Sequence, residues 1–312
     1  KASGYPIARV TAKIAVGMAL EEIQIANTNA AFEPKLDYVI AKLPRFPFDK
    51  FASATNKLGT QMKATGEIMG IGSNLEEALL KGIRSLEIGA NHIYLSKFDN
   101  MSVDELLEYI SEFRSDNIFA IAELLYHGVS VEKLHEVTMI TPYFLNVFKN
   151  IIDMEEKLRE RDDAEILTEA KKMGFSDKYI ARLWKCKELD VYNKRKELGL
   201  FPVFKMVDTC HTNAYIPYFY SSYTGENASR LTDKKKIVVL GAGPIRIGQG
   251  VEFDYSTVHA VMTIKNAGYE AIIINNNPET VSTDYTTADK LYFEPLTPED
   301  VMNIIEFEKP EG

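Results

Sequence analysis

The feature that most constrains the fold is a glycine-rich loop directly after a short apolar strand. The strand and the first glycine read KIVVLG (236–241), and the glycine-rich loop, 241–250, reads GAGPIRIGQG. A helical pattern over 255–267, closed by Gly268, and a second apolar strand, AIIINN, follow. This strand–helix–strand alternation calls for a right-handed crossover between parallel strands. The sequence therefore predicts a Rossmann-like α/β unit in which two strands are recognisable, with open edges unless further sequence completes the sheet.

The glycine-rich loop does not match the usual nucleotide-binding motifs. A dinucleotide fingerprint, GxGxxG, has its third glycine where this chain has Arg246, and Pro244 lacks an N–H that could bind a phosphate. The GxxxxGK[ST] pattern of a P-loop is also missing. A nicotinamide-dependent oxidoreductase is therefore a minor alternative. A plain tight turn above a parallel sheet is the main structural alternative for the loop taken alone.

Polar side chains follow both predicted strands. Arg246 and Glu252 lie in or just after the first loop, and Asn277 and Glu279 follow the second strand. Loops at the carboxyl ends of adjacent parallel strands converge on one crevice, where these groups could hold an anionic or carbonyl-bearing intermediate. The alternative is that Asn-Pro starts a turn and the nearby Thr and Ser side chains cap backbone groups.

The rest of the chain divides into two zones. Residues 1–97 mix strands and helices, with an alternating strand pattern at 36–46 and an amphipathic helix at 76–88. Residues 102–200 contain only three glycines and one proline, which predicts an all-helical bundle. Thr141-Pro142 is a typical helix start, and Gly174 and Gly199 fit helix ends.

Composition excludes some functional classes and disfavours others. The net charge of -9 argues against a nucleic-acid binder, because binding phosphates normally needs a basic face. The five histidines and two cysteines show no zinc-binding spacing, so we expect no metal site. No apolar run reaches the roughly 20 residues needed to cross a membrane, and the first residues, KASGYPIARV, do not have the pattern of a signal peptide, so we expect a cytoplasmic protein. The missing initial Met and the half-built α/β pattern at the other end indicate a piece of a larger polypeptide.

Six segments together resemble the large subunit of glutamine-dependent carbamoyl phosphate synthetase. They occur in the family's order: FEPKLDYVIAKLPRFPFDKF, QMKATGEIMGIG, EEALLKGIRSLE, FKMVDTC, GPIRIGQGVEFDYSTVHA and NNNPETVSTDYTTADKLYFEP. The sequence departs from the family pattern at Ile245, a position that is more often polar.

The resemblance implies a multidomain fold with three parts. Residues 1–97 would be the α+β C-terminal end of a first ATP-grasp synthetase unit, which makes carboxyphosphate. Residues 98–232 would be the all-α oligomerisation domain with a connector. Residues 233–312 would be the incomplete, Rossmann-like pre-ATP-grasp part of a second unit, which makes carbamoyl phosphate.

The resemblance also implies a function for the parent protein, a ligase that makes carbamoyl phosphate for arginine and pyrimidine synthesis. It would use bicarbonate, ammonia from a glutaminase small subunit, and two ATP with Mg or Mn. We expect no bound cofactor and no activity in this chain, because its ATP-binding core segments are not matched and no residue is assigned as catalytic.

Within the resemblance, four residues match positions that would line an internal passage for carbamate: Arg246, Gly250, Glu252 and Glu279. The glycine loop contributes Gly241, Gly243 and Gly248. The helical domain would form a homo-oligomer, and a chain that serves only as a self-association module is the main alternative.

Overall fold

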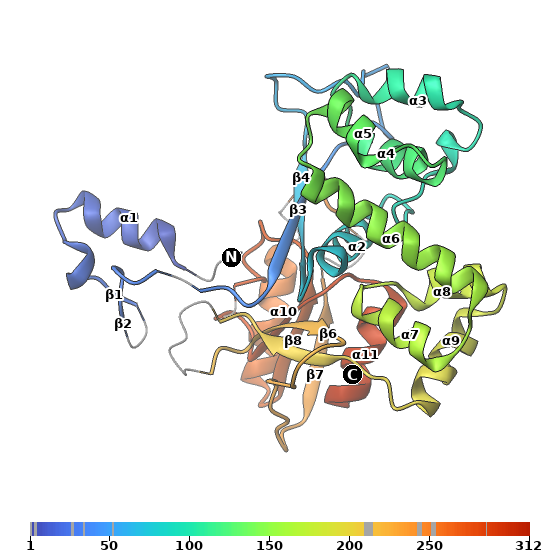
Figure 1. The fold of residues 1–312 in the computed structure, drawn as a ribbon. Coiled ribbons are helices and arrows are strands. Elements are labelled where there is room, and N and C mark those ends of the chain that lie inside the picture. Colours follow the sequence, from blue (N-terminus) through green and yellow to red (C-terminus); the bar gives the residue numbers. More distant parts are fainter. Residues whose placement is uncertain are drawn as a thin grey trace.

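The computed structural model describes most of the chain, namely residues 2, 5–25, 28–33, 35–51, 53–208, 215–241, 245–250, 254–284 and 286–312. Figure 1 shows a β-hairpin with one helix at the centre, helices above and to one side, and a sheet below. A small N-terminal unit stands apart on the other side. It contains α1 (Ile7–Ala15), β1 (Gln24–Ile25) and β2 (Thr28–Asn29), which share a small apolar core of their own.

The central hairpin pairs β3 (Val39–Arg45) with β4 (Gly66–Gly72) in antiparallel register, Val39 opposite Gly72. Helix α2 (Leu75–Ser85) follows and lies directly on β4, as expected for the predicted helix at 76–88. The close approach depends on Gly70, because a Cβ there would lie 2.0 Å from the carbonyl oxygen of Ala78. From Glu77 to Ser85 every residue of α2 is buried, charged residues included.

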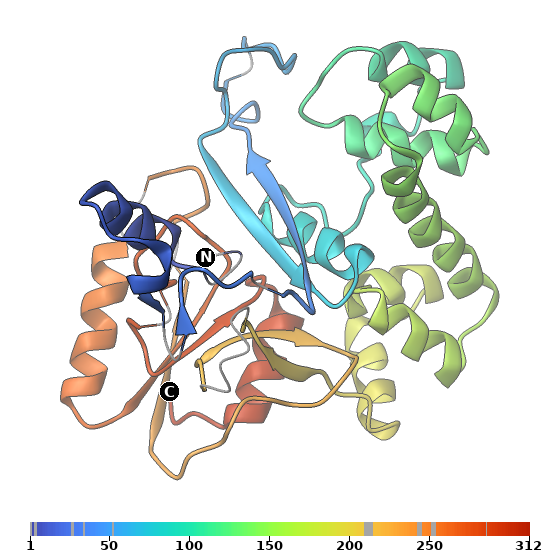
Figure 2. The same cartoon turned by 60° about the vertical axis from the view of Figure 1, so that its left-hand side comes forward.

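The predicted all-helical zone is confirmed. Helix α6 runs between an upper group, α3 to α5, and a lower group, α7 to α9, as Figures 1 and 2 show beside the hairpin. Pro142 occupies the first turn of α6, and Gly174 and Gly199 follow α7 and α9 with φ of +86° and +65°. The bounds are α3 Val103–Ile110, α4 Asn117–Tyr126, α5 Val131–Thr138, α6 Pro142–Glu160, α7 Ala164–Lys172, α8 Asp177–Trp184 and α9 Glu188–Glu197.

The sheet has five strands in the order β5-β6-β9-β8-β7. All neighbours are parallel except β5 and β6, which are antiparallel. Helix α10 (Asp254–Asn266) connects β7 to β8, and α11 (Pro298–Glu308) follows β9. The strands are β5 Val203–Met206, β6 Tyr218–Ser222, β7 Lys236–Leu240, β8 Glu270–Asn275 and β9 Lys290–Phe293.

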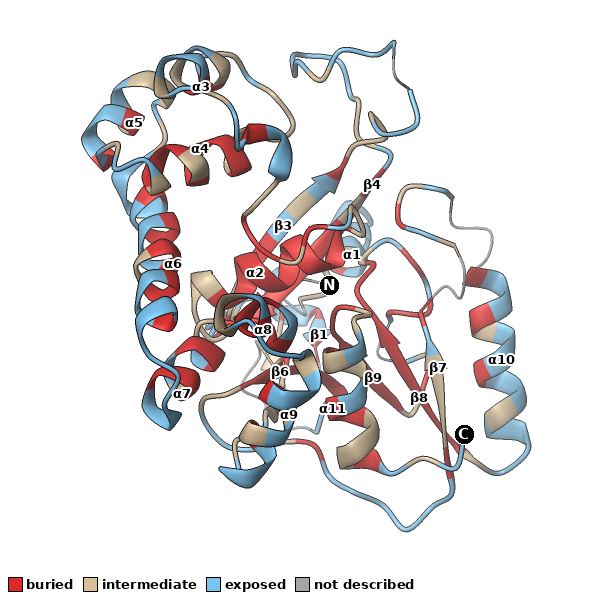
Figure 3. Cartoon of the chain, turned by 90° about the vertical axis from the view of Figure 1, so that its right-hand side faces the viewer, coloured by how far each residue is buried: buried red, intermediate tan, exposed pale blue. Residues whose placement is uncertain are grey.

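Alternate residues of the central strand β8 face two different layers. Ala271 and Ile273 pack with Val261 of α10 and with side chains of the hairpin, whereas Ile272 and Ile274 pack with Ile304 of α11. Figure 3 shows the buried strands and α2 enclosed by the more exposed helices. Because both faces of β8 are covered, its middle residues, 271–274, form a continuous apolar run, as is usual in parallel sheets.

The expectation of a sheet with two recognisable strands was therefore wrong. Strand β9 completes the parallel core, and β6 comes from a segment that sequence analysis treated as a connector. All five residues of β6 are buried, so the segment has no alternation of apolar and polar residues that would mark it as a strand.

Candidate functional site

Gly241 directly follows β7 and has a backbone geometry that favours glycine. Its φ is +41°, its N–H donates to the carbonyl of Ile274, and a Cβ would lie 2.4 Å from Leu296 Cδ1. The hydroxyl of Thr257 in α10 donates to the Gly241 carbonyl at 3.1 Å. Gly241 therefore allows β7, α10 and the β9–α11 connection to pack closely together. Gly243 and Glu252 lie outside the described residues.

Residues 245–250, which we call the docked loop, lie against the hairpin rather than above an open crevice. The N–H of Ile247 donates to Glu87 Oε2 at 3.2 Å, and the Ile247 side chain packs with Ile68 and Leu86. Gly248 has a φ of +85°, and a Cβ there would lie 2.5 Å from Thr65 Oγ1. The loop thus joins the C-terminal α/β unit to the hairpin and the end of α2.

The docked loop also borders a cavity of about 510 Å³, which we call the junction cavity. Its walls come from the end of α2 and the segment after it, from the starts of α8 and α9, from the docked loop, and from the β9–α11 connection. The charged side chains in these walls are three cations and three carboxylates: Arg84, Lys178, Arg246, Glu87, Glu188 and Glu299. A space with both signs of charge can hold a small polar or ionic intermediate.

The carboxylates of the junction cavity are shifted towards the protonated form. Burial raises the pKa of Glu87, although the Ile247 N–H and the charge of Arg246 oppose the shift. Burial likewise raises the pKa of Glu188 and of Glu299. In contrast, Arg84 stays cationic: burial lowers its pKa, but Asp300, 3.4 Å from its Nε, together with Glu299 and Glu294 raises it by more.

Behind the cavity, buried ion pairs connect α2 with the sheet. Lys81 Nζ lies 2.8 Å from Glu294 Oε1, just after β9, and also donates to the carbonyl of Ser221 in β6. Arg84 NH1 donates to the carbonyl of Gly174 in the helical zone. The charged stripe on α2 therefore holds the hairpin unit, the helices and the sheet together.

The Asn-rich turn after β8 is stabilised internally. The side-chain oxygen of Asn275 accepts the N–H groups of Asn276 and Asn277, and Asn277 accepts the N–H of Glu279 at 2.9 Å. Asn276 Nδ2 reaches the carbonyl of Ser85 at the end of α2. These contacts support the turn-and-cap alternative for the asparagines, which are all buried.

The predicted passage residues are only partly brought together. Arg246 is exposed and lines the junction cavity, and Gly250 is half-buried at the end of the docked loop. Glu279 is exposed and is not among the residues that line that cavity. Among the described residues, no group of three or more His, Cys, Asp or Glu side chains could hold a metal ion.

Two family models match the chain. The model of the carbamoyl-phosphate synthetase large chain oligomerisation domain covers residues 67–199, and the carbamoyl phosphate synthase preATP-grasp domain covers residues 233–312. The chain belongs to the carbamoyl-phosphate synthetase large chain family. The first match includes α2 to α9, and the second includes β7, α10, β8, β9 and α11.

In this carbamoyl-phosphate synthetase chain, four charged residues of the site were not predicted from the sequence: Lys81, Arg84, Glu294 and Asp300. A signal for the first two was present, because Glu77, Lys81 and Arg84 recur at helical spacing in a helix whose other positions are largely apolar. Their partners lie more than 200 residues away, so no local pattern could have identified them. No described helix of the synthetase chain has the length and apolar character that crossing a bilayer requires.

Proposed function

We propose that this chain contributes the boundary between two synthetase units of a carbamoyl phosphate synthetase. Residues 1–97 would close the unit that makes carboxyphosphate, residues 98–232 would form the oligomerisation domain with its connector, and residues 233–312 would open the unit that makes carbamoyl phosphate. The docking of residues 245–250 against Thr65 and Glu87 supports this proposal, because segments that the proposal assigns to adjoining units are in direct contact.

The parent enzyme would be an ATP-dependent ligase that uses bicarbonate, two ATP with Mg or Mn, and ammonia from a glutaminase small subunit. Its product would serve arginine and pyrimidine synthesis in the cytoplasm. Phosphoryl transfer depends on positioning and neutralising the triphosphate. We assign no ATP ligand to this chain and therefore propose that the chain alone has no synthetase activity.

Within the parent enzyme, Arg246 and Gly250 would line a passage for carbamate, with Glu252 and Glu279 as further wall residues. Arg246 supports this role best, because its side chain lines a charged cavity between the three parts. A cation there attracts an anionic intermediate, and the surrounding walls limit its contact with water.

The test is Arg246→Gln in the complete large chain, with the exposed Arg9→Gln as the control. We expect Arg246→Gln to lower carbamoyl phosphate formation about tenfold while bicarbonate-dependent ATP hydrolysis remains, since a fault in delivery uncouples the two. Equal loss of both activities, or no loss, would reject the passage role. Bicarbonate-dependent ATP turnover by the 312-residue chain would reject its proposed inactivity.

Self-association through the helical zone is a second, compatible function. The match to an oligomerisation domain over residues 67–199 favours it. Light scattering of the chain at high concentration checks it, and a strictly monomeric species would count against it.

A further inference from the structure

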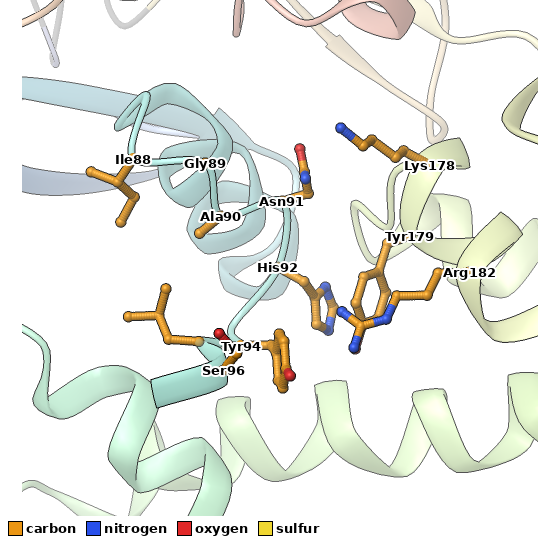
Figure 4. Close-up of a pocket in the computed structure, with 11 residues that line it drawn as sticks. Ile88, Gly89, Ala90, Asn91, His92, Tyr94, Ser96, Lys178, Tyr179 and Arg182 are labelled. Atoms are coloured by element: carbon orange, nitrogen blue, oxygen red, sulfur yellow. The ribbon is translucent and has the colours of Figure 1, made fainter. Parts of the chain in front are cut away.

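A second cavity, which we call the α8 cavity, lies between the segment 88–96 and helix α8 (Figure 4). Its volume is about 470 Å³, within the range of small-molecule sites. Asn91, His92 and Tyr94 line one side, and Lys178, Tyr179 and Arg182 line the other. Part of its wall, including Asn91 and Lys178, also lines the junction cavity, so the two spaces adjoin.

Two cations line this cavity, and neither forms a close ion pair with a described residue. Lys178 and Arg182 are exposed and lie four residues apart on α8, where like charges repel each other. Among the described residues, neither has an acidic side chain within 4.0 Å, although the charges of Glu188 and Glu155 act on Lys178 and Arg182 over longer distances. The Arg182 guanidinium lies instead over the Tyr94 ring, 4.5 Å from its centroid, which keeps it beside the cavity. Figure 4 shows the two side chains extending in different directions, so one anion contacts both only when the flexible Lys178 side chain turns towards the cavity.

The aromatic wall of the cavity is held by a buried polar cluster. The rings of Tyr179 and His92 stack with centroids 3.8 Å apart and an interplanar angle of 12°. Tyr179 donates to Glu155 Oε1 at 2.9 Å, Tyr126 donates to the same oxygen, and His92 Nε2 lies 2.8 Å from it. Glu155 is fully buried on α6. Burying a carboxylate in a helical core costs free energy. In return, the buried Glu155 carboxylate fixes the Tyr179 side chain in one orientation.

We propose that the α8 cavity binds a small organic phosphate. An ammonium and a guanidinium together match a dianionic phosphate better than a monoanionic carboxylate, and the guanidinium can donate two parallel hydrogen bonds. The apolar body of the ligand would lie against Tyr179 and the apolar parts of the 88–96 segment. Inorganic phosphate alone would not fill the volume of the α8 cavity. We therefore expect the ligand to have an organic part. Bound there, it would order Asn91, which borders the junction cavity.

Phenyl phosphate is a suitable probe, since it joins a dianionic group to a planar ring. Binding can be followed by calorimetry and by the fluorescence of Trp184, the single tryptophan, which lies on α8 two residues after Arg182. We expect saturable binding, with benzoate and inorganic phosphate at least about tenfold weaker because each lacks one of the two recognised features.

The variants Lys178→Gln and Arg182→Gln should each weaken phenyl phosphate binding about tenfold, the loss expected for one charge-assisted contact. Lys133→Gln, an exposed lysine of α5, is the matched control and should leave binding unchanged. Both site residues are exposed, so circular dichroism should show intact folding. Absence of saturation up to about 20 mM, or equal affinity in wild type and Arg182→Gln, would overturn the proposal. Benzoate binding as tightly as phenyl phosphate would overturn the assignment to phosphates.

Discussion

Lys81 Nζ and Glu294 Oε1 lie 2.8 Å apart, and both side chains are almost fully buried. The pair joins helix α2, in the part next to the hairpin, to the end of β9 in the C-terminal sheet. Burial raises the pKa of Glu294 to about 7, against the charge of Lys81, and its Oε2 has no hydrogen-bond partner among the described residues. The stability of this contact between distant segments therefore depends both on the charge of Lys81 and on pH.

Removing the cation of this pair should destabilise the contact between α2 and the sheet. Lys81→Met should lower the free energy of unfolding by about 3 kcal/mol at pH 8, because it leaves a buried carboxylate unpaired. Urea denaturation measures the loss. The control is Lys42→Met, which breaks an exposed pair with Glu67 and should cost less than about 1 kcal/mol. Equal losses in the two variants would contradict the role of burial.

The raised pKa of Glu294 predicts a pH dependence of stability. A carboxyl whose pKa is higher in the folded state stabilises the fold most when it is protonated, and this contribution is lost as pH rises from about 4.5 towards 7. The free energy of unfolding of the wild type, relative to Glu294→Gln, should therefore fall over that interval by roughly 1–3 kcal/mol. Urea denaturation at successive pH values measures it, and parallel profiles for the two proteins would refute the shift.

The contact between β4 and α2 should tolerate no side chain at Gly70. A Cβ there would lie 2.0 Å from Ala78 O and 2.5 Å from Gly82 N, which are backbone atoms that cannot rotate away. Gly70→Ala should cost about 3 kcal/mol by thermal or urea unfolding. Gly59→Ala is the control, because a Cβ at that position meets nothing within 4 Å, and its effect should stay within about 0.5 kcal/mol. A neutral Gly70→Ala would show that α2 can shift freely.

Glu299 should hold α11 to the helical zone. Its carboxylate accepts the N–H of Asp177 at 2.6 Å and pairs with Lys171, and all three residues are at least largely buried. In Glu299→Gln we expect the amide of Asp177 to exchange hydrogen several-fold faster, because a charged acceptor is lost and local opening becomes easier. Hydrogen exchange measures this.

Glu306→Gln is the control for that experiment. Glu306 also connects α11 to α9, through Tyr192 and Lys196, but its side chain is partly exposed. Its substitution should leave exchange at Asp177 unchanged. Faster exchange in both variants would indicate general loosening of α11 rather than a specific role of Glu299.

Elements with a clear local signal were predictable. The all-helical zone, the strands at 236–240 and 270–275 and the helix between them all follow from short-range patterns and from glycines at helix ends. Strand β6 was not predictable, because Tyr218–Ser222 is buried on both faces and takes its place only through parallel pairing with β9. The register of such a strand is set by its neighbours rather than by its own alternation.

The candidate site was likewise predictable from the sequence only in part. The glycine-rich loop and Arg246 could be singled out from sequence, and Arg246 does line a charged cavity. The reason for Gly248, its close approach to Thr65, could not be deduced, because the contact involves a hairpin more than 180 residues earlier in the chain.

Local sequence was enough to specify the helical zone, the strand–helix–strand order and the family to which the chain belongs. Hydrophobic period, helix caps and turn residues act between near neighbours, so each segment carries its own signal. The five-stranded sheet, the docked loop and the buried Lys81–Glu294 pair arise from contacts between segments that are far apart in the sequence. Lys81 and Glu294, for example, are separated by 213 residues. Their energies depend on burial and on mutual geometry, which exist only once the chain has folded.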